Sequence, residues 1–167
     1  CQWDQSEPHL QQLRDLVAAL TPDSAVDATL FTHATLMDDP LHQLSVARAM
    51  TNRWRTFQPV DRRTVAGTPH GRIRLGYLSG DFHAHATCVL MAEVFEHHDK
   101  NRFEVFAYSH GPDERSIMRT RVESAIEHFI DTRSMSSLDM ARRIADDQID
   151  VLIDLKGHTS GNRLEVL

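Results

Sequence analysis

The sequence predicts an α/β protein in which an all-helical segment precedes a Rossmann-like parallel sheet. In the first third of the chain, apolar residues recur every three or four positions, as in amphipathic helices. From residue 72 onward, short apolar runs alternate with helical stretches, which is typical of a parallel sheet covered by helices. The stretch from Ile73 to Thr87 reads IRLGYLSGDFHAHAT and combines a strand, a turn and a helix start. Such turns lie at the carboxyl ends of parallel strands, where α/β proteins place their ligands.

Residues 1–55 are predicted to form a helical lead-in, with a frayed polar segment at 1–9. The spacing of apolar residues predicts three helices, at about 10–20, 25–37 and 40–55. Pro22 ends the first helix, because the residue before a proline avoids the α conformation. Pro40 suits the first turn of the third helix.

Residues 56–71 contain two prolines, two glycines and no periodicity, so they are predicted to be a linker. The remainder, 72–167, is predicted to be the sheet domain. Its expected strands lie at 72–78, 103–109, 128–131 and 149–155. Its expected helices lie at about 87–98, at about 114–124, and after an N-cap at Ser136 or Ser137. Gly80 tolerates a positive φ, so the chain is expected to turn sharply after the first strand.

Composition excludes several classes of protein. The 167 residues carry a net charge of −6, from 24 acidic and 18 basic side chains, which argues against a broad nucleic-acid footprint. The apolar runs are too short to span a bilayer, so no membrane partner is expected. The two cysteines have no motif spacing, which favours a reducing cytoplasm over a disulfide framework. Cys88 is expected to be a small core residue.

The two ends of the sequence suggest a fragment of a longer protein. The chain starts at Cys1 rather than at a methionine, within a polar segment. It stops at Leu167, inside what is predicted to be the first turn of a helix. Four strands are also few for a complete sheet of this class, and further strands or another domain are expected.

Five segments occur in a specific order from residue 38 onward. They read DDPLHQLSVAR at 38–48, RIRLGYLSGDFHAHAT at 72–87, FEVFAY at 103–108, HFID at 128–131 and DVLIDLKGHT at 150–159. Gly161 and Arg163 follow the last one. Together these segments resemble the O-linked N-acetylglucosamine transferase family, and most closely its bacterial SPINDLY-like members. The first segment resembles the helix that follows the tetratricopeptide repeats of that family, and the likeness covers about residues 30–167.

The resemblance implies the amino-terminal half of a GT-B glycosyltransferase. The donor UDP-GlcNAc would be bound mainly by a carboxyl-terminal half, the acceptor would be a Ser or Thr hydroxyl of a protein, and no separate cofactor is implied. Residues 1–167 alone are therefore expected to be inactive. Two alternatives stay open: transfer of fucose from GDP-fucose by a SPINDLY-like enzyme, and a non-catalytic Rossmann-like module for protein interaction.

His85 is the candidate catalytic residue, because it lies at the strand-to-helix turn and a histidine can hold or move a proton near neutral pH. The resemblance places it beside the reacting sugar, as a base or as a substrate-orienting group. The alternative is a histidine that bonds the backbone at the helix start. Ala86 follows it where the family usually has proline, which leaves a less rigid helix entry.

The resemblance also implies a substrate-binding loop after the last strand, with Gly157, His158, Thr159, Gly161 and Arg163. Its glycines allow close backbone approach, and an arginine offers a forked cation for phosphate or carboxylate. A flexible loop with a solvated arginine is the alternative.

Four more features of the turns bear on ligand binding. Asp81 is a further substrate-binding candidate, although capping of the next helix is the commoner use of an aspartate there. Asp154 is expected to make a structural bond to a neighbouring loop. His83 and His85 form an H-x-H pair, but no further ligands occur at suitable spacing, so no metal is expected. Gly76 and Gly80 lack the third glycine of a dinucleotide-binding fingerprint.

Overall fold

The computed structural model describes residues 6–21, 24, 30–57, 59–60 and 71–167. The chain divides into two compact units. One comprises residues 1–58 with 158–160, and the other comprises residues 59–157 with 161–167. Each unit is described by itself below.

The first unit is helical, and its helices are α1 (Ser6–Ala18), α2 (Leu30–Leu36), α3 (Pro40–Asn52) and the 3-10 turn η2 (Arg53–Thr56). Both α1 and α2 pack against α3. Val17, Met37 and Val46 are buried there, whereas Leu41 and Leu44 of α3 are exposed.

The helices of this unit differ from the expected ones mainly at their ends. The first helix begins at Ser6, so residues 6–9 are helical and not part of the expected frayed segment. Glu7 lies in the first turn, where its negative charge stabilises the positive end of the helix dipole. Its carboxylate also accepts a hydrogen bond of 2.8 Å from Arg14. The predicted start of the second helix at 25 and most of the predicted linker, 58 and 61–70, lie outside the described residues.

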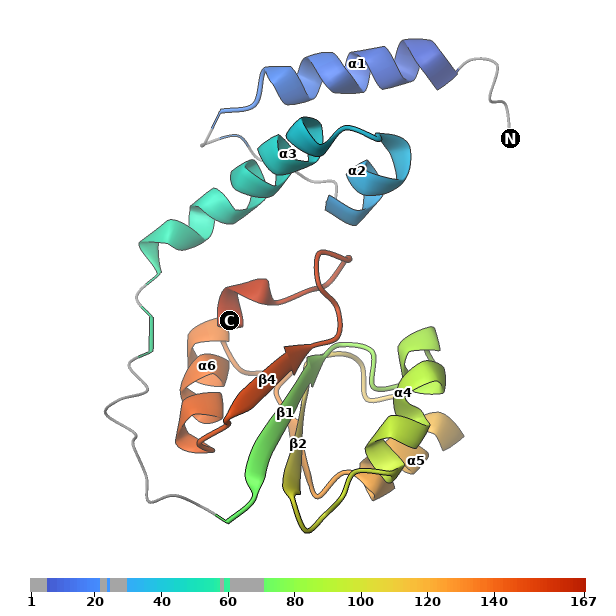
Figure 1. Cartoon of the computed structure of the whole chain (residues 1–167), viewed down its shortest axis with the longest axis vertical. Helices are drawn as coiled ribbons and strands as arrows, with labels where there is room; N and C mark the ends of the chain where they lie inside the picture. Colours follow the sequence, from blue (N-terminus) through green and yellow to red (C-terminus); the bar gives the residue numbers. More distant parts are fainter. Residues whose placement is uncertain (1–5, 22–23, 25–29, 58, 61–70) are drawn as a thin grey trace. The chain divides into compact units, whose positions relative to one another are not determined.

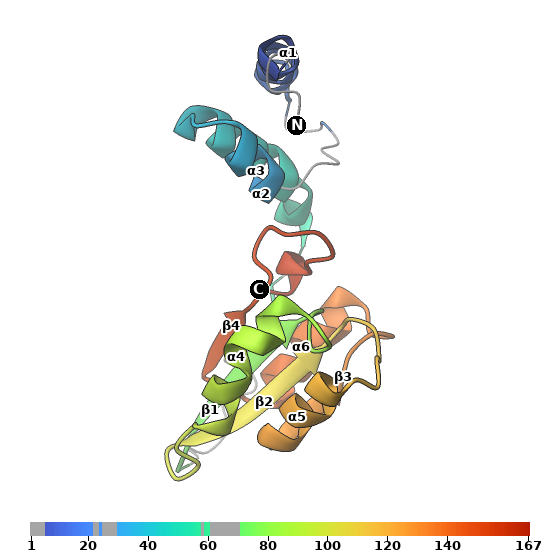
Figure 2. The ribbon, with the colours of Figure 1, turned by 90° about the vertical axis from the view of Figure 1, so that its right-hand side faces the viewer.

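The second unit is an α/β structure with a parallel sheet, as predicted. Its strands are β1 (Ile73–Ser79), β2 (Phe103–Ser109), β3 (His128–Asp131) and β4 (Val151–Asp154). They pair in the order β3-β2-β1-β4, and every pairing is parallel. The helices are α4 (Ala86–Glu96), α5 (Ile117–Ala125), α6 (Ser137–Asp146) and the 3-10 turn η4 (Leu164–Val166). α6 covers one face of the sheet and α4 and α5 the other (Figure 1), where these two helices lie side by side (Figure 2).

Two apolar cores lie on the two faces of the sheet, because successive strand residues point to opposite sides. Leu75 and Tyr77 of β1 face α4 and α5, and Cys88 is fully buried in the same core, as expected. Leu78 and Tyr108 face α6. Gly76 faces the same side of the sheet as α6, and a Cβ on it would lie 3.1 Å from side-chain atoms of Ile149 and Leu152. A side chain at this position would therefore disturb the packing of α6.

Local capping explains where the helices of the sheet unit begin. Ser116 accepts a hydrogen bond from the backbone N–H of Arg119, so α5 starts at Ile117 and not at 114. Ser136 rather than Ser137 caps α6. β4 begins at Val151, two residues later than predicted, after Gln148 takes a positive φ of 54° in the preceding turn.

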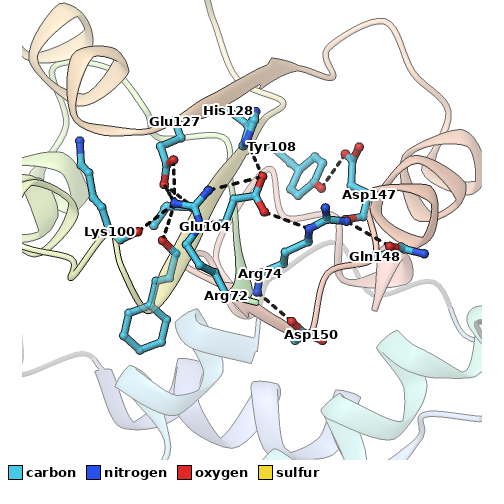
Figure 3. Close-up of polar contacts among 12 residues, drawn as sticks. Arg72, Arg74, Lys100, Glu104, Tyr108, Glu127, His128, Asp147, Gln148 and Asp150 are labelled. Atoms are coloured by element: carbon cyan, nitrogen blue, oxygen red, sulfur yellow. Dashed lines mark hydrogen bonds and ion pairs between the residues drawn. The ribbon is translucent and has the colours of Figure 1, made fainter. Parts of the chain in front are cut away.

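A network of charged side chains joins the amino ends of the strands (Figure 3). Glu104 accepts hydrogen bonds from Arg74 Nε at 3.1 Å and shares one of 2.9 Å with His128 Nε2. Arg72 reaches Glu127 at 2.9 Å. Burial alone raises the pKa of Glu104, but the hydrogen bonds from Arg74 and His128 and the charges of the arginines outweigh it and hold the pKa below its ordinary value. The ionised form of Glu104 therefore stabilises this end of the sheet.

Replacement of Glu104 by glutamine should lower the free energy of unfolding of the chain by about 2 kcal/mol at pH 7, because a charge-assisted interaction is lost. The folded-state pKa is lowered, so this contribution is present above the unfolded pKa and disappears as the pH falls through the folded value. Urea unfolding at pH 7 and pH 3 measures the effect. The exposed Glu93→Gln is the matched control, and a difference from the parent protein that does not decrease between pH 7 and pH 3 would contradict the electrostatic explanation.

Candidate active site

The turns after β1 and β4 meet at the carboxyl edge of the sheet. Asp81, just after β1, accepts hydrogen bonds from Lys156 Nζ on both carboxylate oxygens, each at 2.8 Å. The two side chains are only 12% and 9% exposed, so the pair is largely removed from water. Asp81 does not cap the next helix, the alternative raised for it, because His85 is the N-cap of α4 (Ala86–Glu96) and the Asp81 carboxylate is used for this ion pair. Substrate binding by Asp81 stays a prediction. Sequence reasoning missed Lys156, although it is one of two lysines in the chain and directly follows the last predicted strand.

The turn after β2 lies against the turn after β1. The His110 backbone N–H donates to the Ser79 carbonyl at 3.1 Å. A Cβ on Gly80 would lie 3.0 Å from Cε1 of His110, and a Cβ on Gly111 would overlap the carbonyl of Gly80. Among the described glycines, only Gly157 and Gly161 have a positive φ, so the proposed reason for Gly80 is wrong. It is needed for close packing of two turns, not for a left-handed backbone.

His110 is a second residue that the sequence did not single out. Burial lowers the pKa of its ring, and the charges of Arg163 and Lys156 lower it further, while Asp154 and Asp81 oppose them. Burial and the two cationic side chains thus favour the neutral form of the imidazole. Its Nε2 is buried without a hydrogen-bond partner among the described residues.

His85 is the N-cap of α4, with φ −130° and ψ 155°. Its Nδ1 accepts a hydrogen bond of 3.2 Å from the Thr87 backbone N–H and lies 3.8 Å from Asp81 Oδ2. The alternative of local backbone bonding is thus present in the structure. The side chain is still 44% exposed, and no described residue bonds its Nε2. One ring nitrogen is used by the fold, and the other is open to a ligand.

His83 lies near the same carboxylate as His85, with its Nε2 3.9 Å from Asp81 Oδ1, and has a second partner of its own. Its Nδ1 lies 3.1 Å from Glu114 Oε2, and the two histidine rings are tilted with centroids 5.5 Å apart. In the part of the chain that the structure describes, no group of three or more His, Cys, Asp and Glu side chains is arranged to hold a metal ion.

The loop after β4 contains the predicted residues Gly157, Gly161 and Arg163, and Arg163 bonds the loop between β3 and α6. Gly157 and Gly161 have positive φ angles of 51° and 70°. Asp154 accepts the backbone N–H groups of Lys156 and Gly157, which is the structural role expected for it. Arg163 donates to the Met135 carbonyl and to Ser137 Oγ, both at 2.9 Å. Its guanidinium therefore holds the loop between β3 and α6, and substrate contact by Arg163 stays a prediction.

His158 and Thr159 lie between the two glycines in sequence but are grouped with the other compact unit. Their roles at the site stay predictions. The described helices include none that is both long and apolar enough to cross a membrane.

A parallel sheet with helices on both faces defines a Rossmann-like domain, and domains of this class place their ligands at the carboxyl edge, where the histidines, the ion pair and the glycine turns gather here. The model of Glycosyl transferase family 41 matches residues 42–167, which is well over half of the chain. The chain belongs to this family. The family resemblance read from the sequence is thereby confirmed.

Known relatives support the assignment. SEC of Arabidopsis thaliana, described as a probable UDP-N-acetylglucosamine–peptide N-acetylglucosaminyltransferase, is 41% identical over 95 residues, covering 57% of this chain and 10% of SEC. The UDP-N-acetylglucosamine–peptide N-acetylglucosaminyltransferase of Caenorhabditis elegans is 27% identical over 99% of this chain and 15% of its own length. A solved structure of a variant O-GlcNAc transferase from Thermobaculum terrenum aligns with a TM-score of 0.68 and 25% identity, over 97% of this chain and 32% of that chain. The chain thus spans a third or less of each relative's length.

Proposed function

We propose that this chain is the amino-terminal half of a GT-B catalytic domain, in an enzyme that moves N-acetylglucosamine from UDP-GlcNAc to Ser or Thr hydroxyls of proteins. The observation that carries the proposal is the family match over 42–167, which spans the whole sheet and all three turns of the candidate site. The names of SEC and of the nematode relative supply the donor and the peptide acceptor. Placement among the SPINDLY-like members is part of the proposal, although Arabidopsis SPINDLY is 29% identical, below SEC.

The capping bond of His85 favours one of its two possible roles. The Thr87 N–H donates to Nδ1, so a neutral His85 ring carries its proton on the accessible Nε2. In this conformation Nε2 is a hydrogen-bond donor and not a base. His85 then orients the acceptor or the sugar phosphate, and the proton of the acceptor hydroxyl passes to another group, for which a donor phosphate oxygen is suited.

The complete enzyme should be tested with a panel of nucleotide sugars and a Ser/Thr-containing protein acceptor, alongside the 167-residue chain alone. Transfer from UDP-GlcNAc by the complete enzyme, with no turnover by the chain alone, is expected. Preferred use of GDP-fucose would overturn the choice of sugar. Measurable turnover by the isolated chain would overturn the half-domain proposal, and absence of transfer from every donor would favour an interaction module.

A further inference from the structure

A buried arginine from α5 connects the turns after β1 and β2. Arg119 is only 5% exposed, and its Nη1 donates to the Phe82 carbonyl at 2.9 Å and to Ser109 Oγ at 3.0 Å. Phe82 follows Asp81 and lies three residues before His85. Ser109 is the last residue of β2 and precedes His110. One guanidinium nitrogen thus bonds to the turn after β1 and to the end of β2, where the second turn of the candidate site begins.

The surroundings of Arg119 fix its position closely. Its Nε pairs with Glu123 one turn along α5, and the guanidinium carbon lies 4.4 Å from the centroid of the Phe129 ring. Burial of a cation is unfavourable, and a well-packed apolar side chain would often be at least as stable in such a position. An apolar side chain could not, however, replace the rigid guanidinium that donates to both the Phe82 carbonyl and Ser109 Oγ.

The turn that carries His85 is held from two sides. The Phe82 ring is buried in the core and contacts Phe95 and Phe129, while its carbonyl is bound by Arg119. Cys88 Sγ lies 3.1 Å from the Asp81 carbonyl. Asp81 immediately precedes this anchored residue, and His85 follows it by three positions. A shift of the Phe82 carbonyl would therefore move both.

From these contacts we infer that Arg119 is a positioning residue that sets the orientation of the 81–85 turn relative to His110, without itself contacting substrate. The expected effect of Arg119 on kcat rests on the proposed function. Its expected effect on the orientation of the 81–85 turn does not. Misplacement of a reacting group by about 1 Å can lower a rate by about 100-fold, so the expected effect is on kcat.

The test compares Arg119→Lys with Arg121→Lys. Arg121 lies on the same helix but is exposed and pairs with Glu96 of α4, so it is a matched control. In the 167-residue chain, we expect Arg119→Lys to shift the NMR signals of the 82–87 amides and of the His83 and His85 rings, and to speed amide exchange there at least 10-fold. Arg121→Lys should leave these signals in place.

Ser109→Ala is the second variant, since it removes one acceptor and little volume. It should shift the same amide signals by a smaller amount while the chain stays folded. In the complete enzyme, Arg119→Lys should lower kcat at least 10-fold and change the donor KM less than twofold. Unchanged turn signals in both Arg119→Lys and Ser109→Ala would overturn the inference. If the signals move but no variant or parent transfers sugar, the positioning role stands and the proposed function fails.

Discussion

Replacement of His85 by asparagine is expected to lower kcat of the complete enzyme on the order of 100-fold while α4 remains as stable as before. Removal of one preorganised donor at a reacting centre lowers turnover by about 10²–10³-fold. Asparagine is also a good N-cap, so it can accept the Thr87 N–H in place of Nδ1. His85→Ala should lose both functions, with the same fall in kcat and a loss of about 1 kcal/mol in the free energy of unfolding.

The comparison of the two substitutions separates capping from chemistry. Steady-state transfer to a protein acceptor gives kcat, and thermal unfolding of the 167-residue chain gives stability. His97→Asn is the control, because His97 lies exposed at the other end of the same helix and bonds only the Glu93 carbonyl. If His85→Asn transferred sugar at the parent rate, His85 would be a helix cap and nothing more.

The strands and the place of the site could be predicted from the sequence because both depend on local patterns. The bounds of β2 and β3 are those predicted, since each is an apolar run enclosed by polar turns. His85 was also placed at the correct turn, because strand-to-helix turns always lie at one edge of a parallel sheet. Local spacing was sufficient for these features.

The contacts within the site could not be predicted, because they join residues far apart in sequence. Asp81 and Lys156 are separated by 75 positions, and no local rule pairs them. Arg119 is separated from Phe82 by 37 positions, and its own helix gives no sign that it is buried. Gly80 shows the same limit, since its small size is required by His110 of the neighbouring turn. A sequence pattern identifies a turn but not what packs against it.

Loss of the Asp81–Lys156 ion pair should have a large effect on stability. Lys156→Met leaves the Asp81 carboxylate without its partner in a place where water reaches little of it. Removal of one member of a buried pair is expected to lower the free energy of unfolding by about 3 kcal/mol. Lys100→Met is the control, because Lys100 is the other lysine of the sequence and its side chain is exposed.

The double variant Asp81→Asn with Lys156→Met tests whether the ion pair has only a structural role or also contributes to turnover. Without the carboxylate, the unpaired charge is gone, so the double variant should be more stable than Lys156→Met alone, with a coupling of about 1–3 kcal/mol in a double-mutant cycle. If the pair only joined the turns after β1 and β4, the recovered fold would recover turnover in the complete enzyme. We expect turnover to stay low, because Asp81 and Lys156 lie beside His85 and His110 and supply charges at the edge where we propose that the sugar donor and acceptor bind. Stability and turnover that recover together would reduce the ion pair to a structural link.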